Sequence, residues 1–300
     1  MKSGLNSVTV KEALKRASFC LQETGVDQPR EEAEILLARI MQIDRLNLFL
    51  KQACEVPSDK LETFWQLIER RAKGEPVAYL IQEKYFYGFR FTVNRKIMIP
   101  RPETELLVDR AVMWADRLKD LRGKRIKAVD LGTGSGALAV TLALLCPRAE
   151  VWAVDSSPAA LEVARENASL HNVAQRIRFY QGNYFHALKL LPEKPKFNLI
   201  VSNPPYVSEP EINNLSREVK DYEPRGALYG GKDGLDHYRQ IFEQLPDYTA
   251  EKFLLLMEIG AGQKEKVEAL LKETGVIDSF AWFDDLSGWP RVLEAAAINH

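Results

Sequence analysis

The sequence contains few cysteines and no long apolar run. These two features argue against a disulfide-stabilised protein and against a membrane-spanning one. Its three cysteines, Cys20, Cys54 and Cys146, are far apart and lack metal-ligand spacing. We therefore expect small apolar side chains in a reducing compartment, without a disulfide framework or a metal site. The first residues contain no apolar signal segment, and runs such as residues 253–257 are too short to span a bilayer. We expect a cytoplasmic protein without a membrane partner.

Neither sign of charge is in excess. The 41 Lys and Arg residues and 42 Asp and Glu residues give a net charge of −1. A protein whose main partner is nucleic acid usually carries a basic excess or a basic stripe. We therefore expect no direct nucleic-acid binding, and we interpret the basic cluster Arg70-Arg71-Ala72-Lys73 as a solvated helix face.

The first 75 residues show helical patterns and no strand pattern. Thr9, Pro29 and Ser58 each stand where an amphipathic helix would begin, and Gly74 stands where the last would end. Short helices with short connections predict a small bundle. Because this region contains no histidine and no notable pair of carboxylates, we assign residues 1–75 to recognition of a protein substrate.

The pattern changes after residue 75. Residues 85–93 alternate aromatic and polar side chains around a glycine, which predicts a β-hairpin. We expect residues 76–99 to be a linker that contains this hairpin, and residues 100–300 to form the second domain.

The second domain alternates β-prone and helical segments, beginning with a helix at residues 106–119. This alternation predicts an α/β fold with a mostly parallel, doubly wound sheet. The last two strands have no helix between them, which predicts an antiparallel hairpin. The expected strands are residues 126–130, 151–155, 177–180, 197–202, 253–259, 280–283 and 292–297.

A glycine-rich turn follows the first of these strands and reads Asp130-Leu131-Gly132-Thr133-Gly134-Ser135-Gly136. Glycines at such a turn let the backbone approach a ligand closely. The Asp130 carboxylate would repel a pyrophosphate and favour a ligand with a cationic group. Asp155 ends the second strand, where a carboxylate can accept hydrogen bonds from ribose hydroxyls. A ribose and a cation without phosphate describe S-adenosylmethionine; the alternative is a plain glycine-rich turn with a capping aspartate.

Asn183 and Tyr184 follow the third strand. The Tyr184 ring could stack on an adenine, and the Asn183 amide could bond the edge of the base. A turn with a core aromatic residue is the alternative interpretation. Further along, residues 207–236 are punctuated by proline and glycine and are too long for a simple connection, so we expect a lid over the site.

The stretch Asn203-Pro204-Pro205-Tyr206 follows the strand at residues 197–202. Consecutive prolines force an extended exit from the sheet and hold Asn203 at its carboxyl edge, where ligands bind in α/β folds. Asn203 and the Pro204 carbonyl could accept the two hydrogens of a planar –NH2 group, while the Tyr206 ring covers its plane. The alternative is an ordinary proline-rich loop.

Together these segments resemble the HemK-type protein-(glutamine-N5) methyltransferases, which modify peptide chain release factors. The resemblance spans about residues 10–298. The segments that carry it are residues 99–105, 130–136, 155, 203–206, 224–228, 230–235, 258–260 and 285–291. The Asn-Pro-Pro-Tyr element alone is shared with DNA adenine and RNA guanine methyltransferases.

The resemblance implies a class I methyltransferase fold, a protein-(glutamine-N5) methyltransferase activity in translation termination, and release factors 1 and 2 as protein substrates. S-adenosylmethionine would be the methyl donor and S-adenosylhomocysteine the product. Substrate glutamine would be held by Asn203, Pro204, Pro205 and Tyr206, with Asn203, Pro204 and Tyr206 acting in catalysis. The donor would contact Asp130, Gly132, Thr133, Gly134, Ser135, Gly136, Asp155, Asn183, Tyr184 and Asn203.

Two residues depart from the family pattern. Asn183 stands where the family usually has Asp, which puts its contact with adenine in doubt, and Gln82 replaces a usual Gly near the hairpin. Two other functions remain open at this point. A nucleic-acid amino methyltransferase would need a basic channel with aromatic platforms, and a catalytically silent donor-binding module would need no intact Asn203–Tyr206 element.

Overall fold

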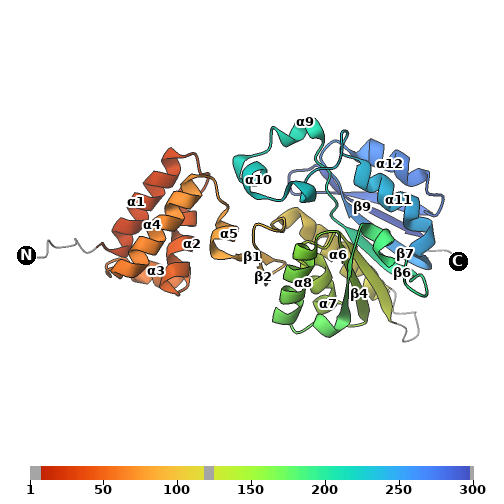
Figure 1. Ribbon diagram of the computed structural model, residues 1–300, viewed down its shortest axis with the longest axis horizontal. Coiled ribbons are helices and arrows are strands. Elements are labelled where there is room, and N and C mark those ends of the chain that lie inside the picture. The colour runs from red at the N-terminus through yellow and green to blue at the C-terminus, as the bar shows by residue number, and fades with distance from the viewer. Residues whose placement is uncertain (1–7, 118–124, 298–300) are drawn as a thin grey trace, which may run out of the picture. The chain divides into compact units, whose positions relative to one another are not determined.

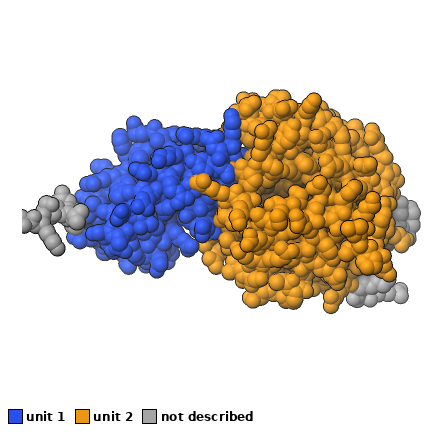
Figure 2. Space-filling model, in the orientation of Figure 1, with its two compact units in different colours: residues 1–82, 217–222 blue, residues 83–216, 223–300 orange. Residues whose placement is uncertain are grey.

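The computed structural model describes residues 8–117 and 125–297. The chain forms two compact units, residues 1–82 with 217–222 and residues 83–216 with 223–300 (Figure 2). These units differ from the expected boundaries in two places, because the hairpin belongs to the second unit and residues 217–222 belong to the first. The recognition role of the first unit stays a prediction.

The first unit is helical, as expected. A capping box begins its first helix, because the Thr9 hydroxyl accepts from the Glu12 N–H and the Glu12 carboxylate accepts from the Thr9 N–H. Apolar faces meet in a core that includes Leu14, Leu36 and Phe64. The helices are α1 (Val10–Glu23), α2 (Pro29–Met41), α3 (Arg45–Leu50), α4 (Ser58–Ala72), α5 (Val77–Ile81) and, from a distant part of the chain, α10 (Arg217–Tyr222) (Figure 1).

The expectation of a solvated basic face is wrong for Arg71. Its side chain is only 3% exposed and pairs with Glu32 of α2 and Glu218 of α10. A buried guanidinium requires such compensation, since an unpaired charge in a low-dielectric interior is strongly destabilising. Glu218 thereby joins α10 to the helical unit.

The expected hairpin is present and packs on the second unit. Its strands are β1 (Glu83–Phe86) and β2 (Phe89–Thr92), and Tyr87 and Gly88 between them have φ values of 52° and 74°. Two consecutive positive φ angles are typical of a tight hairpin turn. Phe86 and Phe91 enter the core of the second unit, which explains why the hairpin is part of it. Gln82, just before the hairpin, has a φ of 57°, which is the left-handed region where a glycine would be unstrained.

The second unit contains a mixed sheet in the order β5-β4-β3-β6-β7-β9-β8. Strands β3 to β7 are parallel, and β9 runs antiparallel to both of its neighbours, so the predicted fold class is confirmed. The strands are β3 (Ile126–Leu131), β4 (Ala149–Asp155), β5 (Ile177–Gln181), β6 (Phe197–Ser202), β7 (Thr249–Glu258), β8 (Ser279–Asp284) and β9 (Pro290–Ala297).

Helices cover both faces of this sheet, and alternate strand residues enter two separate cores (Figure 1). Ala128 packs on the face covered by α6 (Glu105–Arg117), α7 (Ala137–Leu145) and α8 (Pro158–Leu170). Its neighbour Val129 packs on the face of α11 (Asp236–Tyr248) and α12 (Lys264–Lys272). The helix expected at residues 106–119 is α6, and residues 118–119 lie outside the described part.

The expected lid at residues 207–236 contains α9 (Glu209–Ile212), α10 and the 3-10 turn η5 (Arg225–Ala227). Cys146 is a buried apolar side chain, as expected, but Cys20 and Cys54 are exposed, so that expectation is wrong for two of the three cysteines. Within residues 8–117 and 125–297, no helix is long and apolar enough to cross a bilayer, and no group of three or more potential ligands is arranged around a metal position. The cytoplasmic location stays a prediction.

Candidate active site

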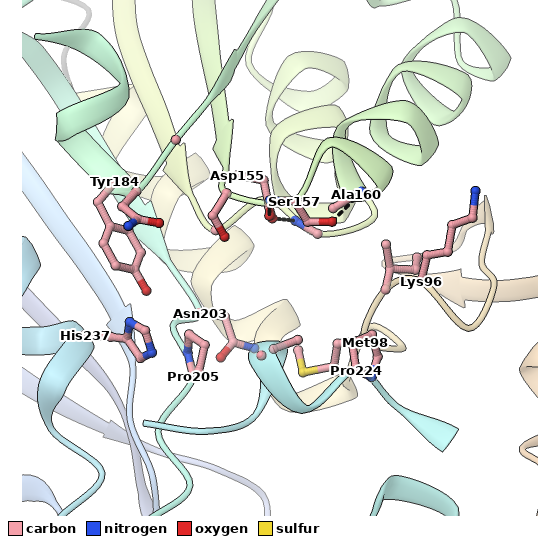
Figure 3. Close-up of a pocket in the computed structure, with 18 of the residues that line it drawn as sticks. Lys96, Met98, Asp155, Ser157, Ala160, Tyr184, Asn203, Pro205, Pro224 and His237 are labelled. Carbon is pink, nitrogen blue, oxygen red and sulfur yellow. Dashed lines mark hydrogen bonds between the residues drawn. The ribbon is translucent and has the colours of Figure 1, made fainter. Parts of the chain in front are cut away.

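A cavity of about 420 Å³ lies in the second unit at the carboxyl ends of the parallel strands. The strand order reverses between β3 and β6, and ligands bind at such switch points in α/β sheets. The volume is within the range of small-molecule sites. Asp155 and Tyr184 lie on one side, which we call the donor side, and Asn203 and Pro205 face them from the opposite side, which we call the amide side (Figure 3).

The structure brings about half of the sequence-predicted residues to this cavity. Those that line it are Gly132, Gly134, Asp155, Asn183, Tyr184, Asn203 and Pro205. The remaining ones lie outside the lining, and a direct role for them stays a prediction: Asp130, Thr133, Ser135, Gly136, Pro204 and Tyr206.

The glycines of the turn after β3 have two different functions. Gly132 and Gly134 have φ values of 82° and 55°, and a Cβ would approach nothing closer than 4.0 Å at Gly132 and nothing within 4 Å at Gly134. Bare backbone therefore faces the cavity. A Cβ on Gly136 would lie 3.0 Å from the Cβ of Ala164, so this glycine allows α7 to pack against α8.

Asp155 stands at the end of β4 with its carboxylate held by backbone donors. Its Oδ2 accepts from the Gly134 N–H at 2.8 Å and its Oδ1 from the Ser157 N–H at 2.9 Å. Burial raises the pKa of the Asp155 carboxyl, and these N–H groups oppose the rise. Each oxygen keeps a further lone pair that can accept from a hydroxyl on a ligand.

Asp130 lies beneath the glycine turn and is fully buried. Its Oδ2 accepts from the Thr133 hydroxyl at 2.6 Å and the Ala139 N–H at 3.1 Å, whereas its Oδ1 has no partner among the described residues. Burial raises the pKa of Asp130 to about 7, and the charge of Asp155 adds to the rise. The two hydrogen bonds of Asp130 hold the glycine turn in place. They also put a titratable carboxyl group behind the donor side.

Tyr184 and His237 meet at the edge of the cavity (Figure 3). Their rings lie edge to face with centroids 5.7 Å apart, and Tyr184 adopts an uncommon φ of 47°. The His237 Nε2–H donates to the Tyr229 carbonyl at 3.1 Å, and its Nδ1 has no partner within the described chain. Burial lowers the pKa of His237, so the ring is neutral at pH 7. His237 was not predicted from the sequence, where its only signal is its place at the start of a helix after a glycine-rich segment.

On the amide side, Asn203 is fixed through residues that the sequence analysis did not assign. Its Nδ2 donates to the Thr104 hydroxyl at 2.9 Å, and that hydroxyl donates to Glu258 Oε2 at 2.6 Å. The Tyr206 hydroxyl donates to Glu258 Oε1 at 3.2 Å. Burial raises the pKa of the Tyr206 phenol, so it remains a neutral donor. Tyr206 is therefore linked to Asn203 through Glu258 and Thr104.

Comparisons with known proteins agree with this architecture. A model of the PrmC N-terminal domain matches residues 12–81, and a model of the methyltransferase small domain matches residues 110–219. The N-terminal domain of human METTL16 in complex with SAH superposes with a TM-score of 0.51 at 14% identity, covering 71% of this chain and 77% of that one, which supports the fold alone.

Two relatives cover nearly the whole chain. The release factor glutamine methyltransferase of Bacillus cereus is 38% identical over 287 residues, which are 95% of this chain and 98% of that protein. The enzyme of the same name from Geobacter sulfurreducens is 36% identical over 285 residues, which are 95% of each. The chain therefore belongs to the family of release factor glutamine methyltransferases.

Proposed function

We propose that the protein transfers a methyl group from S-adenosylmethionine to the side-chain nitrogen, N5, of the glutamine in the Gly-Gly-Gln motif of release factors 1 and 2. The observation that carries this proposal is the position of the Asn203 amide, which faces Asp155 across one cavity (Figure 3). Gly132 and Gly134 line the same cavity. The two sides thus offer one place for a nucleoside and one place for an amide.

The donor side suits a ribose and a cationic group. Asp155 has acceptor capacity left after its two backbone bonds, and Gly132 and Gly134 present backbone without side chains. The Tyr184 ring adds an aromatic wall for a base. S-adenosylmethionine supplies an activated methyl group on a sulfonium when it is bound here.

The amide side suits orientation of a weak nucleophile. An amide nitrogen reacts poorly because its lone pair is delocalised into the carbonyl. Asn203 Oδ1 and the Pro204 carbonyl would accept the two hydrogens of the substrate –NH2 group and aim the lone pair at the methyl carbon. Alignment at about 3–3.5 Å is worth roughly 7–11 kcal/mol in comparable reactions.

The bonds and charges of the transfer balance without a metal or a redox partner. The nitrogen–carbon bond forms as the sulfur–carbon bond breaks, and the bond pair remains on sulfur. The methylated nitrogen becomes acidic and releases its proton to water. Because a positive charge disappears from the donor, a cavity with little water favours the transition state.

The helical unit is proposed to recognise the body of the release factor. Its surface exposes large apolar side chains, among them Phe19, Leu46, Phe49 and Leu50. An intact release factor should therefore be a better substrate than a short peptide that contains only the Gly-Gly-Gln segment. The same kcat/KM for both would remove this role from the helical unit.

The experiment is mass spectrometry of release factor after incubation with donor and enzyme. We expect one added methyl group on the motif glutamine. Replacing Asn203 by Ala should lower turnover by about 10²-fold, because the nucleophile loses its orientation. Asn203→Asp should lower turnover more than donor affinity, since the added charge stabilises the cationic ground state.

Asn214→Ala, which changes an exposed asparagine, is the matched control and should keep normal turnover. Methyl groups on adenine or guanine of nucleic acid, with the release factor unmodified, would contradict the proposed substrate. Bound donor without any transfer would instead favour a silent binding module.

A further inference from the structure

We propose that Thr104 and Glu258 are positioning residues that set which end of the Asn203 amide faces the substrate. The two residues form a hydrogen-bond relay with Asn203 behind the cavity wall. The inference deepens the proposed function and rests on the role proposed there for Asn203.

The relay joins three segments that are distant in the sequence. Asn203 follows β6, Thr104 ends the 3-10 turn η1 (Pro102–Thr104), and Glu258 ends β7. The bonds are short, 2.9 Å from Asn203 Nδ2 to Thr104 Oγ1 and 2.6 Å from Thr104 Oγ1 to Glu258 Oε2. Thr104 is 5% exposed and Glu258 is 1% exposed. Water therefore competes little with these bonds.

The number of protons determines the direction of the relay. An ionised carboxylate only accepts hydrogen bonds, and a hydroxyl has a single proton to donate. Thr104 gives its proton to Glu258 and can offer only a lone pair to Asn203. Asn203 must then present its Nδ2 to Thr104, which leaves Oδ1 for the substrate.

This direction matters because the substrate group is itself a donor. A glutamine –NH2 brings two hydrogens, which need acceptors. If the Asn203 amide turned by 180°, its own –NH2 would face the substrate –NH2, and neither could accept well. The relay therefore selects the orientation of the Asn203 amide that can accept the substrate hydrogens. Thr104 and Glu258 do this without contacting the substrate.

The groups around Glu258 determine the pH at which its carboxyl loses its charge. From β9, the charge of Arg291 favours the ionised form, and from η1, the charge of Glu103 opposes it. Tyr206 donates to its side chain, and the Tyr238 hydroxyl of α11, which donates to Gln263 Oε1 at 3.1 Å, lies 3.4 Å from its backbone carbonyl. Burial is the largest influence and raises the pKa of Glu258 above its ordinary value.

Protonation of Glu258 would remove the constraint on direction. A neutral carboxyl can donate to Thr104, and Thr104 can then donate to Asn203, which allows the reversed amide. Turnover should therefore decline on the acid side at a pH above the ordinary range of a glutamate, while donor affinity is little changed by this group.

The test compares Thr104→Val, which keeps the shape and removes the hydroxyl, with Thr104→Ser, which keeps the hydroxyl. Thr104→Val should lower kcat by about 10- to 30-fold, the equivalent of one strong buried hydrogen bond. Thr104→Ser should restore most of it. Donor affinity should change much less than kcat in both, and the acid-side decline should vanish in Thr104→Val because Glu258 no longer controls Asn203.

Thr141→Val is the matched control for a buried threonine. Thr141 is fully buried in α7, and its hydroxyl has no partner in the described residues. This variant should keep normal kcat. A kcat that falls equally in Thr141→Val and Thr104→Val would show a packing effect and overturn the relay.

A second measurement does not depend on the substrate. In a nitrogen-15 NMR spectrum of the wild-type protein, the Asn203 side-chain amide is identified by its loss in Asn203→Asp. We expect one of its protons to exchange slowly and its shift to follow the titration of the Glu258 carboxyl. A shift that ignores this titration would overturn the relay, even if Thr104→Val failed to fold or the methylated substrate proved to be another molecule.

Discussion

The two sides of the cavity each have a fully buried carboxyl group behind them, and the two groups are held differently. Asp130, behind the donor side, accepts from Thr133 and Ala139 through one oxygen only, and the charge that acts on it is that of another acid, Asp155. Glu258, behind the amide side, uses both oxygens and lies within the influence of Arg291.

The difference indicates what each carboxyl is for. A buried acid without a counter-charge is poised to interact with a cation brought by the ligand. A buried acid with donors on both oxygens is already satisfied and acts on the groups that donate to it. We therefore expect a cationic ligand to stabilise the ionised form of Asp130, whereas both oxygens of Glu258 already have hydrogen-bond partners in the protein.

The largest expected effect on the donor side comes from Asp155→Ala. The loss of a charged acceptor for ribose hydroxyls should weaken donor affinity by about 1.5–3 kcal/mol in calorimetry. Glu150→Ala, at the other end of β4, is the control and should leave affinity unchanged. An unchanged affinity in Asp155→Ala would show that Asp155 does not bind the donor.

A smaller effect is expected in the pH dependence of the unfolding free energy, through the titration of Asp130. The folded-state pKa of about 7 exceeds the ordinary value of 3.8, so the contribution of Asp130 to stability is complete below pH 3.8 and is lost as the pH rises through about 7. Between pH 6 and 8 the wild type should lose about 1–1.5 kcal/mol of unfolding free energy that Asp130→Asn does not lose.

Denaturant unfolding at several pH values measures this difference, and the exposed Asp247→Asn is the control. Added donor should also reduce the loss, because a cation favours the ionised carboxylate. If the unfolding free energies of wild type and Asp130→Asn changed in parallel with pH, Asp130 would not titrate near neutrality. The proposed difference between Asp130 and Glu258 would then be wrong.

The smallest effect is expected at Asn183, which lines the donor side. Asn183→Asp should tighten donor binding by about 0.5–1 kcal/mol, since a charged acceptor forms a stronger hydrogen bond than a neutral one. Calorimetry on both proteins measures it. Weaker binding in Asn183→Asp would show that the amide is adapted to this cavity.

The two sides also differ in how far the sequence predicts them. The donor side is formed by turns that directly follow successive strands, so alternation of strand and helix was enough to place Gly132 and Asp155. The amide side depends on Thr104, which is 99 residues from Asn203 and 154 residues from Glu258. Thr104 and Glu258 lie in segments that carry the family resemblance, but no local pattern of a Thr or a Glu predicts such a contact.

Arg71 illustrates the same limit in the fold. Its neighbours in the chain are charged and helical, which favours an exposed face. Its burial depends on Glu32 and on Glu218, the latter 147 residues away. Periodic patterns predict elements and faces, but pairing between distant polar residues is decided by the assembled structure.

The membership of α10 in the helical unit has a consequence for folding during synthesis. Residues 1–82 leave the ribosome first, yet Arg71 meets Glu218 only after residue 218 has been made. At translation rates of about 5–20 residues per second, the unit remains without this partner for roughly 7–27 s. The helical unit is therefore completed only after most of the second unit has been made, and its last helix, α10, belongs to the segment that follows Asn203.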